Sequence, residues 1–591
     1  MSDPTAYDFS GLNLFAFSDE EGGAPFKFDR DVADAVVGPD QGIPELLRST
    51  FTINGEGIIT DMAAGNALAF LGDLVDNEAH SIRVLSALVD LKKRKPREVL
   101  LIGGNRDYNK IRMGIELYLE ADDGTLPWAE TESFADLLTK LQGDDFHFRK
   151  QTVPEYLVGV KLWDDNLADL QKAYVAPGKN FNERLTIMFS KTLGVNIAKG
   201  DLVREINTIF GSGLSVGEEL TAKVLCVVQM AMSYNWTAAD LPEYFRTEGE
   251  NSMNINGLYL QYIEQSHAIA MFQMNGKLGV MSHGGLPQAY IKGAALDKRA
   301  LTSPMGFYWE TPEFTPSTLS VVIANIEKEK DALLEEMAIV KETGYEVGVN
   351  KIIDKFIHTT AGTNLKNYDA AKNPYGKNSR YASTEGEHAR FGAYALNSPV
   401  VGFQAIDTQA RRNILVQRGG TWIDDDLAKA EKLYVADGDD IIHYNIYGHA
   451  PQGFHPTAYR EAQTLHVCLD VSKIDGAANN YSFAFLHVTA ADTNIIGRIK
   501  FPAANANNVF EGAAAEFADK IVYYNQPVTA DGPYEFLKAA AIPGCNVKFE
   551  QIMLGPGKFG PRKFTKAAAG GGRRRTRKAR KGRKATRRRR L

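Results

Sequence analysis

Short and almost wholly apolar runs recur along the chain, and glycines and polar residues follow each of them directly. The first three runs occupy residues 14–17, 67–71 and 99–102. Between the second and the third, residues 81–95 carry apolar side chains at helical spacing and end in a basic turn, which suits the carbonyl end of a helix. Pro96 stops this helix. Because strands this apolar must be covered on both faces, the strand–helix–strand pattern predicts a parallel sheet.

Two further runs of this kind lie far downstream, in "GKLGVMSH" (276–283) and "DDIIHYNIYGH" (439–449). The residues between the third and the fourth run, 112–275, have patterns that are mostly typical of helices. After the last run, residues 464–473 and 481–490 are predicted to form an antiparallel strand pair. We therefore expect an α/β protein whose strands are separated by long helical insertions.

Each of the five predicted strand ends carries side chains that suit a cation or a phosphate. These side chains are Asp19 and Glu21, Asp73 and Asp76, Asn105 and Arg106, His283, and His449. In α/β sheets, ligands bind just beyond the carboxyl ends of the strands. Taken alone, an aspartate beside a glycine is usually a turn, and a histidine after a strand is usually a structural polar residue. Together, these oxygen and imidazole donors predict two metal ions, about 3.5–4 Å apart, that clamp a phosphate and activate water.

The order and spacing of these motifs resemble the calcineurin-like metallophosphoesterases, nearest to the protein serine/threonine phosphatases and the diadenosine tetraphosphatases. The family pattern is DxH, GDxxD, GNH[DE], His-Gly-Gly and a final His, and the chain has SDEEG, GDLVDN, GGNRD, SHGGLP and YGHAPQG. The resemblance covers residues 11–110, 276–290 and 440–490. It implies a layered sheet sandwich flanked by helices. The GNRD form is similar to members of this superfamily from protists and giant viruses.

The resemblance also implies a role for each candidate ligand. Asp19 and Glu21 would hold the first metal ion, Asp73 would bridge both ions, and Asn105, His283 and His449 would hold the second. Glu21 replaces the histidine of the DxH motif, which makes the site harder and more anionic. This favours Mn²⁺, with Mg²⁺, Fe and Zn²⁺ left open.

Two departures from the family pattern concern catalysis. Arg106 stands where the family has its general-acid histidine, and Asn77 stands where protein phosphatases have an arginine for the substrate phosphate. Asp76, the acid that would orient the family histidine, is present. Two interpretations of Arg106 remain open: an ion pair with Asp76, or a cation that clamps phosphate.

The resemblance predicts one domain that is interrupted by two insertions and followed by a C-terminal part outside the family pattern. The predicted parts are the first piece of the metallophosphoesterase domain (11–110), a helical insertion (111–275), the second piece (276–494) with a second insertion at about 315–435, a C-terminal extension (495–565), and a disordered basic tail (566–591).

An acidic body carries this basic tail. From Arg573 to Leu591 the chain has thirteen lysines and arginines and no acid, so the other residues carry −19, which is the net −6 less those thirteen positive charges. A glycine-rich linker precedes the run, and like charges this dense predict disorder. The tail is either an import or solubility signal or an anchor on nucleic acid or another polyanion. Such ends also resemble those of proteins packaged in large DNA virus particles.

The remaining composition excludes other classes of protein. The three cysteines, Cys226, Cys468 and Cys545, are far apart, which argues against a disulfide scaffold or a thiolate zinc site and favours a reducing compartment. The first residues do not form a signal peptide, and no run of about 18 apolar residues is present to span a membrane. We therefore expect an intracellular protein of the cytoplasm or nucleus, with packaging in a virion left open.

These observations together predict a binuclear metal-dependent phosphoesterase that hydrolyses a phosphate ester or phosphoanhydride with metal-activated water. Its phosphorylated substrate stays open among a phosphoprotein, a nucleotide and a dinucleoside polyphosphate. The alternative is a catalytically weak structural or virion-associated nucleic-acid-binding protein that retains the metallophosphoesterase fold.

Overall fold

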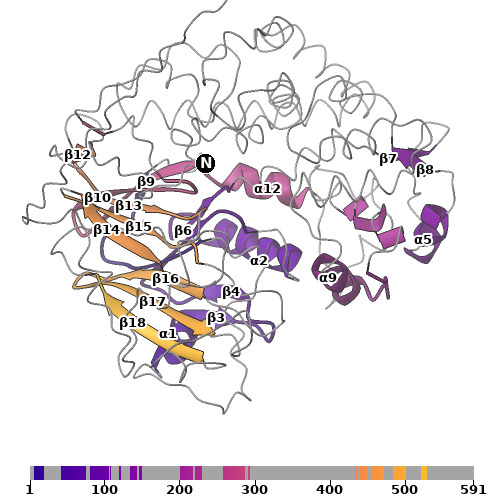
Figure 1. Ribbon diagram of the computed structural model, residues 1–591, viewed down its shortest axis with the longest axis horizontal. Helices are drawn as coiled ribbons and strands as arrows, with labels where there is room; N and C mark the ends of the chain where they lie inside the picture. Colours follow the sequence, from indigo (N-terminus) through magenta and orange to yellow (C-terminus); the bar gives the residue numbers. More distant parts are fainter. Residues whose placement is uncertain are drawn as a thin grey trace, which may run out of the picture.

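The computed structural model describes part of the chain. The described residues are 6–18, 42–74, 80–104, 107, 119–121, 134–142, 146–148, 200–216, most of 220–228, 257–285, 291–292, 433–434, 440–449, 456–461, 463–471, 483–500 and 521–528. Two six-stranded sheets dominate this part of the chain, and they lie against each other (Figure 1).

The first sheet, called sheet I, contains the three apolar runs that open the chain. Its strand order is β18 (Ile521–Pro527), β17 (Thr493–Lys500), β16 (Phe483–Val488), β2 (Asn13–Phe17), β5 (Asn66–Leu71) and β6 (Val99–Ile102). The pairs β2–β5 and β5–β6 are parallel, whereas β16, β17 and β18 are antiparallel to their neighbours. The parallel half of the sheet is therefore the part built by the predicted strand–helix–strand unit.

The second sheet, sheet II, contains the two downstream runs. Its strand order is β1 (Ala6–Asp8), β9 (Ile269–Met274), β10 (Lys277–Ser282), β13 (Ile442–Tyr447), β15 (Thr464–Cys468) and β14 (Thr457–Glu461). The central pairs β10–β13 and β13–β15 are parallel. A hairpin joins β9 to β10 through Asn275 and Gly276, which both have positive φ, as the tightest hairpin turns require.

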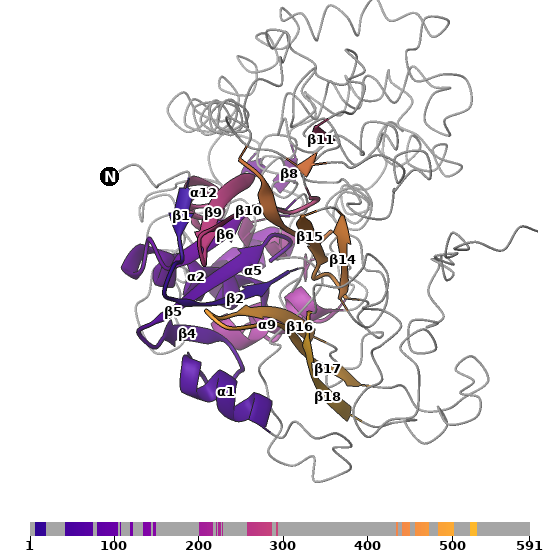
Figure 2. The same ribbon diagram turned by 90° about the vertical axis from the view of Figure 1, so that its left-hand side faces the viewer.

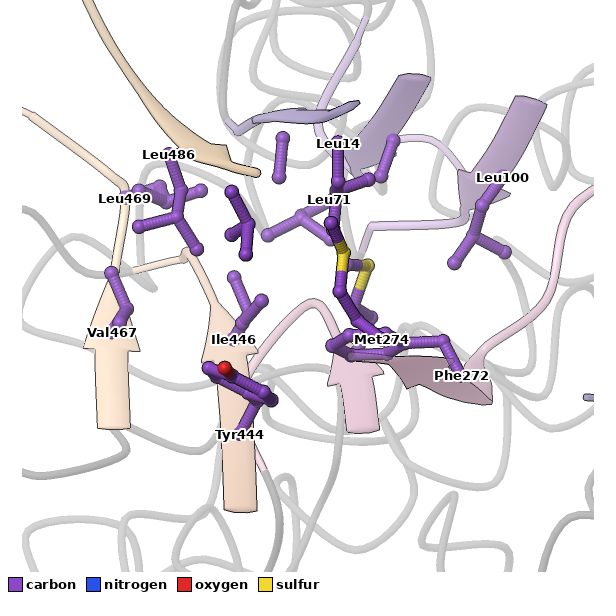
Figure 3. Packing of buried hydrophobic residues seen from close by; sticks show 14 of the residues in the cluster. Leu14, Leu71, Leu100, Phe272, Met274, Tyr444, Ile446, Val467, Leu469 and Leu486 are labelled. Atoms are coloured by element: carbon purple, nitrogen blue, oxygen red, sulfur yellow. The ribbon is translucent and has the colours of Figure 1, made fainter. Parts of the chain in front are cut away.

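The hydrophobic core fills the space between the two sheets. Figure 3 shows Leu14, Leu71, Leu100 and Leu486 of sheet I gathered with Phe272, Met274, Tyr444, Ile446 and Val467 of sheet II. Successive residues of a strand point to opposite faces. Within β2, Leu14 therefore faces this core, while Phe15 points the other way and packs against Phe51 with ring centroids 5.1 Å apart.

The outer face of sheet I is covered by the elements around Phe51. These elements are α1 (Gly42–Thr50), β3 (Phe51–Ile53), β4 (Ile59–Met62) and α2 (Ser81–Arg94). In Figure 2, α1 and β4 lie on the side of sheet I that faces away from β9 and β10. Phe17 also packs on this side, against Phe70 and Phe485, so an aromatic layer separates the sheet from its covering elements.

The region predicted as a helical insertion contributes several short elements. They are β7 (Leu119–Ala121), α5 (Phe134–Gln142), β8 (Phe146–Phe148), α9 (Asp201–Phe210) and α12 (Leu258–Gln265). The helix α12 leads directly into β9 and packs against α2. In contrast, α9 and α5 lie beyond α2, further from the sheets (Figure 1).

The helix α9 completes the N-terminal end of α2. The residue before α2, His80, makes no side-chain capping bond, and the first turn of α2 has no acidic residue. Instead, one carboxylate oxygen of Glu205 accepts the backbone N–H groups of Ile82 and Arg83, at 2.8 and 3.0 Å. Glu205 is fully buried, so a side chain from a distant part of the sequence supplies the missing helix cap.

The mixed α/β class predicted from the sequence is confirmed for the described residues, as are the five strands and α2. The predicted pairing of residues 464–473 with 481–490 is wrong, because β15 lies in sheet II and β16 in sheet I. Each strand has an antiparallel partner closer in sequence: β15 pairs with β14 and β16 pairs with β17.

The predicted boundary at residue 494 is also wrong, since it falls inside β17. Sheet I continues into the predicted extension 495–565, where β18 pairs antiparallel with β17. The basic tail 566–591 and nearly all of the second insertion (315–435) lie outside the described residues. None of the helices in the described part of the chain is long and apolar enough to cross a membrane.

Candidate metal centre

Three of the predicted ligands meet where strands of the two sheets end. Asp73 follows β5 of sheet I, His283 follows β10, and His449 follows β13 of sheet II. One ligand atom from each of the three lies within 4.8 Å of the other two. Asp73 and His283 are buried and His449 is half-buried. A carboxylate and two imidazoles at these distances form a group that could hold a metal ion.

Two of the three side chains sit on backbone that is unusual for residues other than glycine. Among the described residues, positive φ at a non-glycine position occurs at Asp73 (50°), Asn275 (52°) and His449 (71°). Asn275 belongs to the β9–β10 hairpin turn, where this conformation is expected. The other two are candidate ligands. Such conformations cost on the order of 1–3 kcal/mol, and they cluster at functional sites that hold them in place.

The ring of His283 is oriented by the backbone of sheet I. Its Nδ1 lies 2.6 Å from the carbonyl oxygen of Leu71. A carbonyl can only accept, so Nδ1 carries a proton and donates it to this bond. The other ring nitrogen, Nε2, then faces Oδ2 of Asp73 at 3.3 Å. Metal-bound histidines usually donate their second nitrogen to such a partner, which fixes the ring and increases its basicity.

The distance between Nε2 of His283 and the Asp73 carboxylate fits a shared cation. A neutral imidazole nitrogen and a carboxylate oxygen are both acceptors, so they repel unless positive charge lies between them. Two ligand atoms that are each about 2.0–2.2 Å from one ion lie about 3–3.5 Å apart at ordinary coordination angles. A second proton on His283 would also supply the charge, and would make the contact an ion pair instead.

His449 is held against His283 by neighbouring backbone. The two rings lie 5.1 Å apart between centroids, at an angle of 69°. The N–H of Gly448 donates to the carbonyl of His283 at 2.8 Å, and Cys468 contacts the carbonyl of Gly448. The ends of β10 and β13 are therefore joined directly beside the two imidazoles.

The loops after β5 and β6 touch backbone to backbone. A Cβ atom on Gly72 would lie 2.5 Å from the nitrogen of Gly104 and 2.8 Å from Nδ1 of His283. A Cβ atom on Gly104 would overlap the backbone nitrogen and the carboxylate of Asp73. Only glycine fits at both positions, and Gly72 also has a φ of 89°.

Asp107 is a buried carboxylate that joins these two loops, and its role was not predicted from the sequence. Its Oδ1 accepts the N–H of Leu74 at 3.0 Å, and its Oδ2 accepts the N–H of Gly104 at 2.8 Å. The hydroxyl of Tyr262 lies 3.2 Å from the same Oδ2. The sequence did contain an indication of this role: Asp107 directly follows Asn105 and Arg106, at the position where the GNH[DE] motif has Asp or Glu.

The other predicted site residues lie outside the described residues. These are Asp19, Glu21, Asp76, Asn105 and Arg106. The described part thus brings together Asp73, predicted to bridge two ions, and the two histidines predicted for the second ion. The site for the first ion and the interpretation of Arg106 stay predictions.

Fold and site together define a mixed α/β protein with a candidate metal centre where its two sheets meet. No protein-family model, curated protein or solved structure was found to match the chain. The function of the chain is therefore inferred from the chemistry of its own residues.

Proposed function

We propose that the chain is a metal-dependent phosphoesterase with the layered fold of the metallophosphoesterases. The observation that carries this proposal is the convergence of Asp73, His283 and His449, each placed directly after a strand as the predicted motif order requires. The two facing sheets, each with three neighbouring parallel strands, support it. So does the left-handed backbone at two of the three ligands.

Each described residue has a distinct part in this proposal. Asp73 supplies the carboxylate that would bridge two ions, Nε2 of His283 supplies a lone pair held in place through Nδ1, and His449 closes the set from sheet II. Asp19 and Glu21 would hold the first ion, and Asn105 would join the histidines. When bound, two Mn²⁺ ions would supply a Lewis acid for the phosphate oxygens and a nucleophilic water at neutral pH.

The composition of the tail favours a second candidate function. Thirteen cations between Arg573 and Leu591 suit a polyanion, and nucleic acid is the polyanion that an intracellular or virion protein meets. In this alternative the metal centre is a structural part of a nucleic-acid-binding protein with weak catalysis or none. The two candidate functions differ in whether the metal-bound centre hydrolyses phosphate esters.

The proposed function is tested by removing and restoring metal. We expect the full-length chain, stripped by a chelator, to lose hydrolysis of p-nitrophenyl phosphate and to regain it with Mn²⁺, two ions being bound per chain. Phosphopeptides, nucleotides and dinucleoside polyphosphates are then compared as substrates. A protein that binds its metal fully but hydrolyses none of these would favour the structural alternative.

A further inference from the structure

We propose that Asp107 is a positioning residue that holds the backbone of Asp73 in the shape the metal centre needs, an inference that rests on the metal centre of the proposed function and not on its catalysis. Asp107 is fully buried. Its two oxygens accept N–H groups from two different loops, those of Leu74 after β5 and Gly104 after β6. Hydrogen bonds to a carboxylate are stronger than those between neutral groups, so one side chain fixes the spacing of both loops.

This bond acts directly on a candidate ligand. Leu74 is the residue after Asp73, whose φ of 50° is unfavourable for a side chain other than glycine. The Asp107 carboxylate holds the N–H of Leu74, and with it the peptide unit that follows Asp73. Loss of the bond favours relaxation of Asp73 toward negative φ, which moves its Oδ2 away from Nε2 of His283. Asp107 therefore shapes the centre without contacting the ion.

Tyr262 holds Asp107 from the other side. The tyrosine is fully buried on α12, and its hydroxyl lies 2.7 Å from the carbonyl of Ile102 and 3.2 Å from Oδ2 of Asp107. Both partners are acceptors and the hydroxyl has a single proton, so the proton is shared, mostly with the nearer carbonyl. Because α12 lies within the predicted insertion 111–275, this hydroxyl connects that part of the chain to the centre.

The chain offers a matched control for this role. Glu205 is also fully buried and also accepts two backbone N–H groups, from Ile82 and Arg83. It does so at the start of α2 and touches none of the three candidate ligands. Replacing each acid by its amide keeps the size of the side chain and alters the same kind of bond, a buried carboxyl group that accepts two backbone N–H groups. Only the Asp107 change is expected to reach the metal centre.

The test compares metal binding in Asp107→Asn, Tyr262→Phe, Glu205→Gln and the wild type, all as full chains. Mn²⁺ affinity is measured by calorimetry, and Co²⁺ is used as a probe of the ligand geometry through its visible spectrum. We expect Asp107→Asn to lose about 10–100-fold in affinity, as other residues that orient metal ligands do, and to change the Co²⁺ spectrum. Tyr262→Phe should change both in the same direction but less. Glu205→Gln should bind as the wild type does.

Wild-type affinity and an unchanged Co²⁺ spectrum in Asp107→Asn would overturn the inference. So would an equal loss in Glu205→Gln, because the effect would then be general destabilisation. If Asp107→Asn does not fold, Tyr262→Phe decides, and an unchanged affinity there has the same meaning. A wild type that binds Mn²⁺ without hydrolysing phosphate esters would remove the proposed function and leave this inference standing. A wild type that binds no metal would remove both.

Discussion

At the scale of single residues, Asp73 combines burial, a left-handed backbone and a close histidine. Its carboxylate is the only proposed ligand that would contact both ions. We expect Asp73→Asn to lose at least one ion and nearly all turnover while the fold survives, because the neutral amide is a far weaker ligand. Metal analysis and circular dichroism check this, with Asp90→Asn as a control at an exposed carboxylate on α2. Two ions still bound in Asp73→Asn would remove the assignment.

The two histidines are expected to behave differently from Asp73. Both are assigned to the second ion alone, so His283→Ala and His449→Ala should each empty mainly that site. The ratio of metal to protein should then fall toward one ion rather than none. Loss of both ions in either variant would show that the sites do not fill independently.

Arg106 sets the expected preference among substrates. A histidine in that position could give a proton to the leaving oxygen, but arginine stays charged because guanidinium is a far weaker acid than imidazolium. We therefore expect higher kcat/KM on phosphoanhydrides and aryl phosphates than on phosphoserine, whose alkoxide leaves poorly without a proton. Arg106→His should raise the rate on the alkyl ester relative to the anhydride, and Arg106→Ala should lower both.

The comparison requires three substrates: a phosphoserine peptide, p-nitrophenyl phosphate and a dinucleoside polyphosphate. A wild type that prefers phosphoserine, together with full activity in Arg106→Ala, would contradict this role. Another residue would then supply the acid, and Arg106 would only pair with Asp76.

At the scale of elements, the capping of α2 by Glu205 predicts a dependence on pH. Burial raises the pKa of Glu205 from 4.5 to about 8, against the opposing effect of the Ile82 and Arg83 N–H groups and the Arg83 cation, whose Nε lies 3.7 Å away. Between these two values the folded chain holds a proton that the unfolded chain has released. The free energy of unfolding should therefore fall as pH rises from about 5 to about 8.

Urea unfolding across this range checks the prediction. One such proton gives a slope on the order of 1.4 kcal/mol per pH unit, and Glu205→Gln, which cannot titrate, should lack that part of the slope. Arg83 also contacts Glu56, so Glu56→Gln is the control for the rest of this charge cluster. Equal slopes in the wild type and Glu205→Gln would mean that Glu205 stays ionised in the folded protein.

Some of these helices and strands could be predicted from the sequence, and others could not. The strands β2, β5 and β6 were predictable because their apolar runs are short and end in glycine or polar residues, and α2 because its period is clear and Pro96 follows it. The partners of β15 and β16 were not, since two apolar runs look alike whichever sheet they join. Pairing depends on neighbours that the local pattern does not contain.

The candidate metal centre, too, could be predicted only in part. Asp73, His283 and His449 were predictable because each follows a strand end beside a glycine. That they come from two different sheets was not visible in the pattern. The role of Asp107 depends on its burial and on the N–H groups of Leu74 and Gly104, and neither is recorded in the order of residues.

At the scale of the whole molecule, the charge is divided between an acidic body and a basic end. Thirteen cations should bind polyanions by releasing counterions, so log affinity should fall steeply as log salt rises. We expect deletion of residues 573–591 to abolish retention on DNA or RNA and to leave turnover of a small phosphate ester unchanged. Binding assays at several salt concentrations check this. Equal binding by the truncated body, at −19, would show that another surface is responsible.

The pairing of β2 with β16 can form only late in the synthesis of a new chain. Phe15 lies opposite His487, so one edge of β2 stays unpaired until a strand 472 residues further along the chain has left the ribosome. At about 5–20 residues per second, that interval is on the order of 25–95 s. During it, an apolar strand edge is open to other chains, and His283 and His449 are added only 268 and 434 residues after Phe15. The β2 edge is therefore exposed to aggregation during synthesis, and the three ligands can hold metal together only once His449 has been translated.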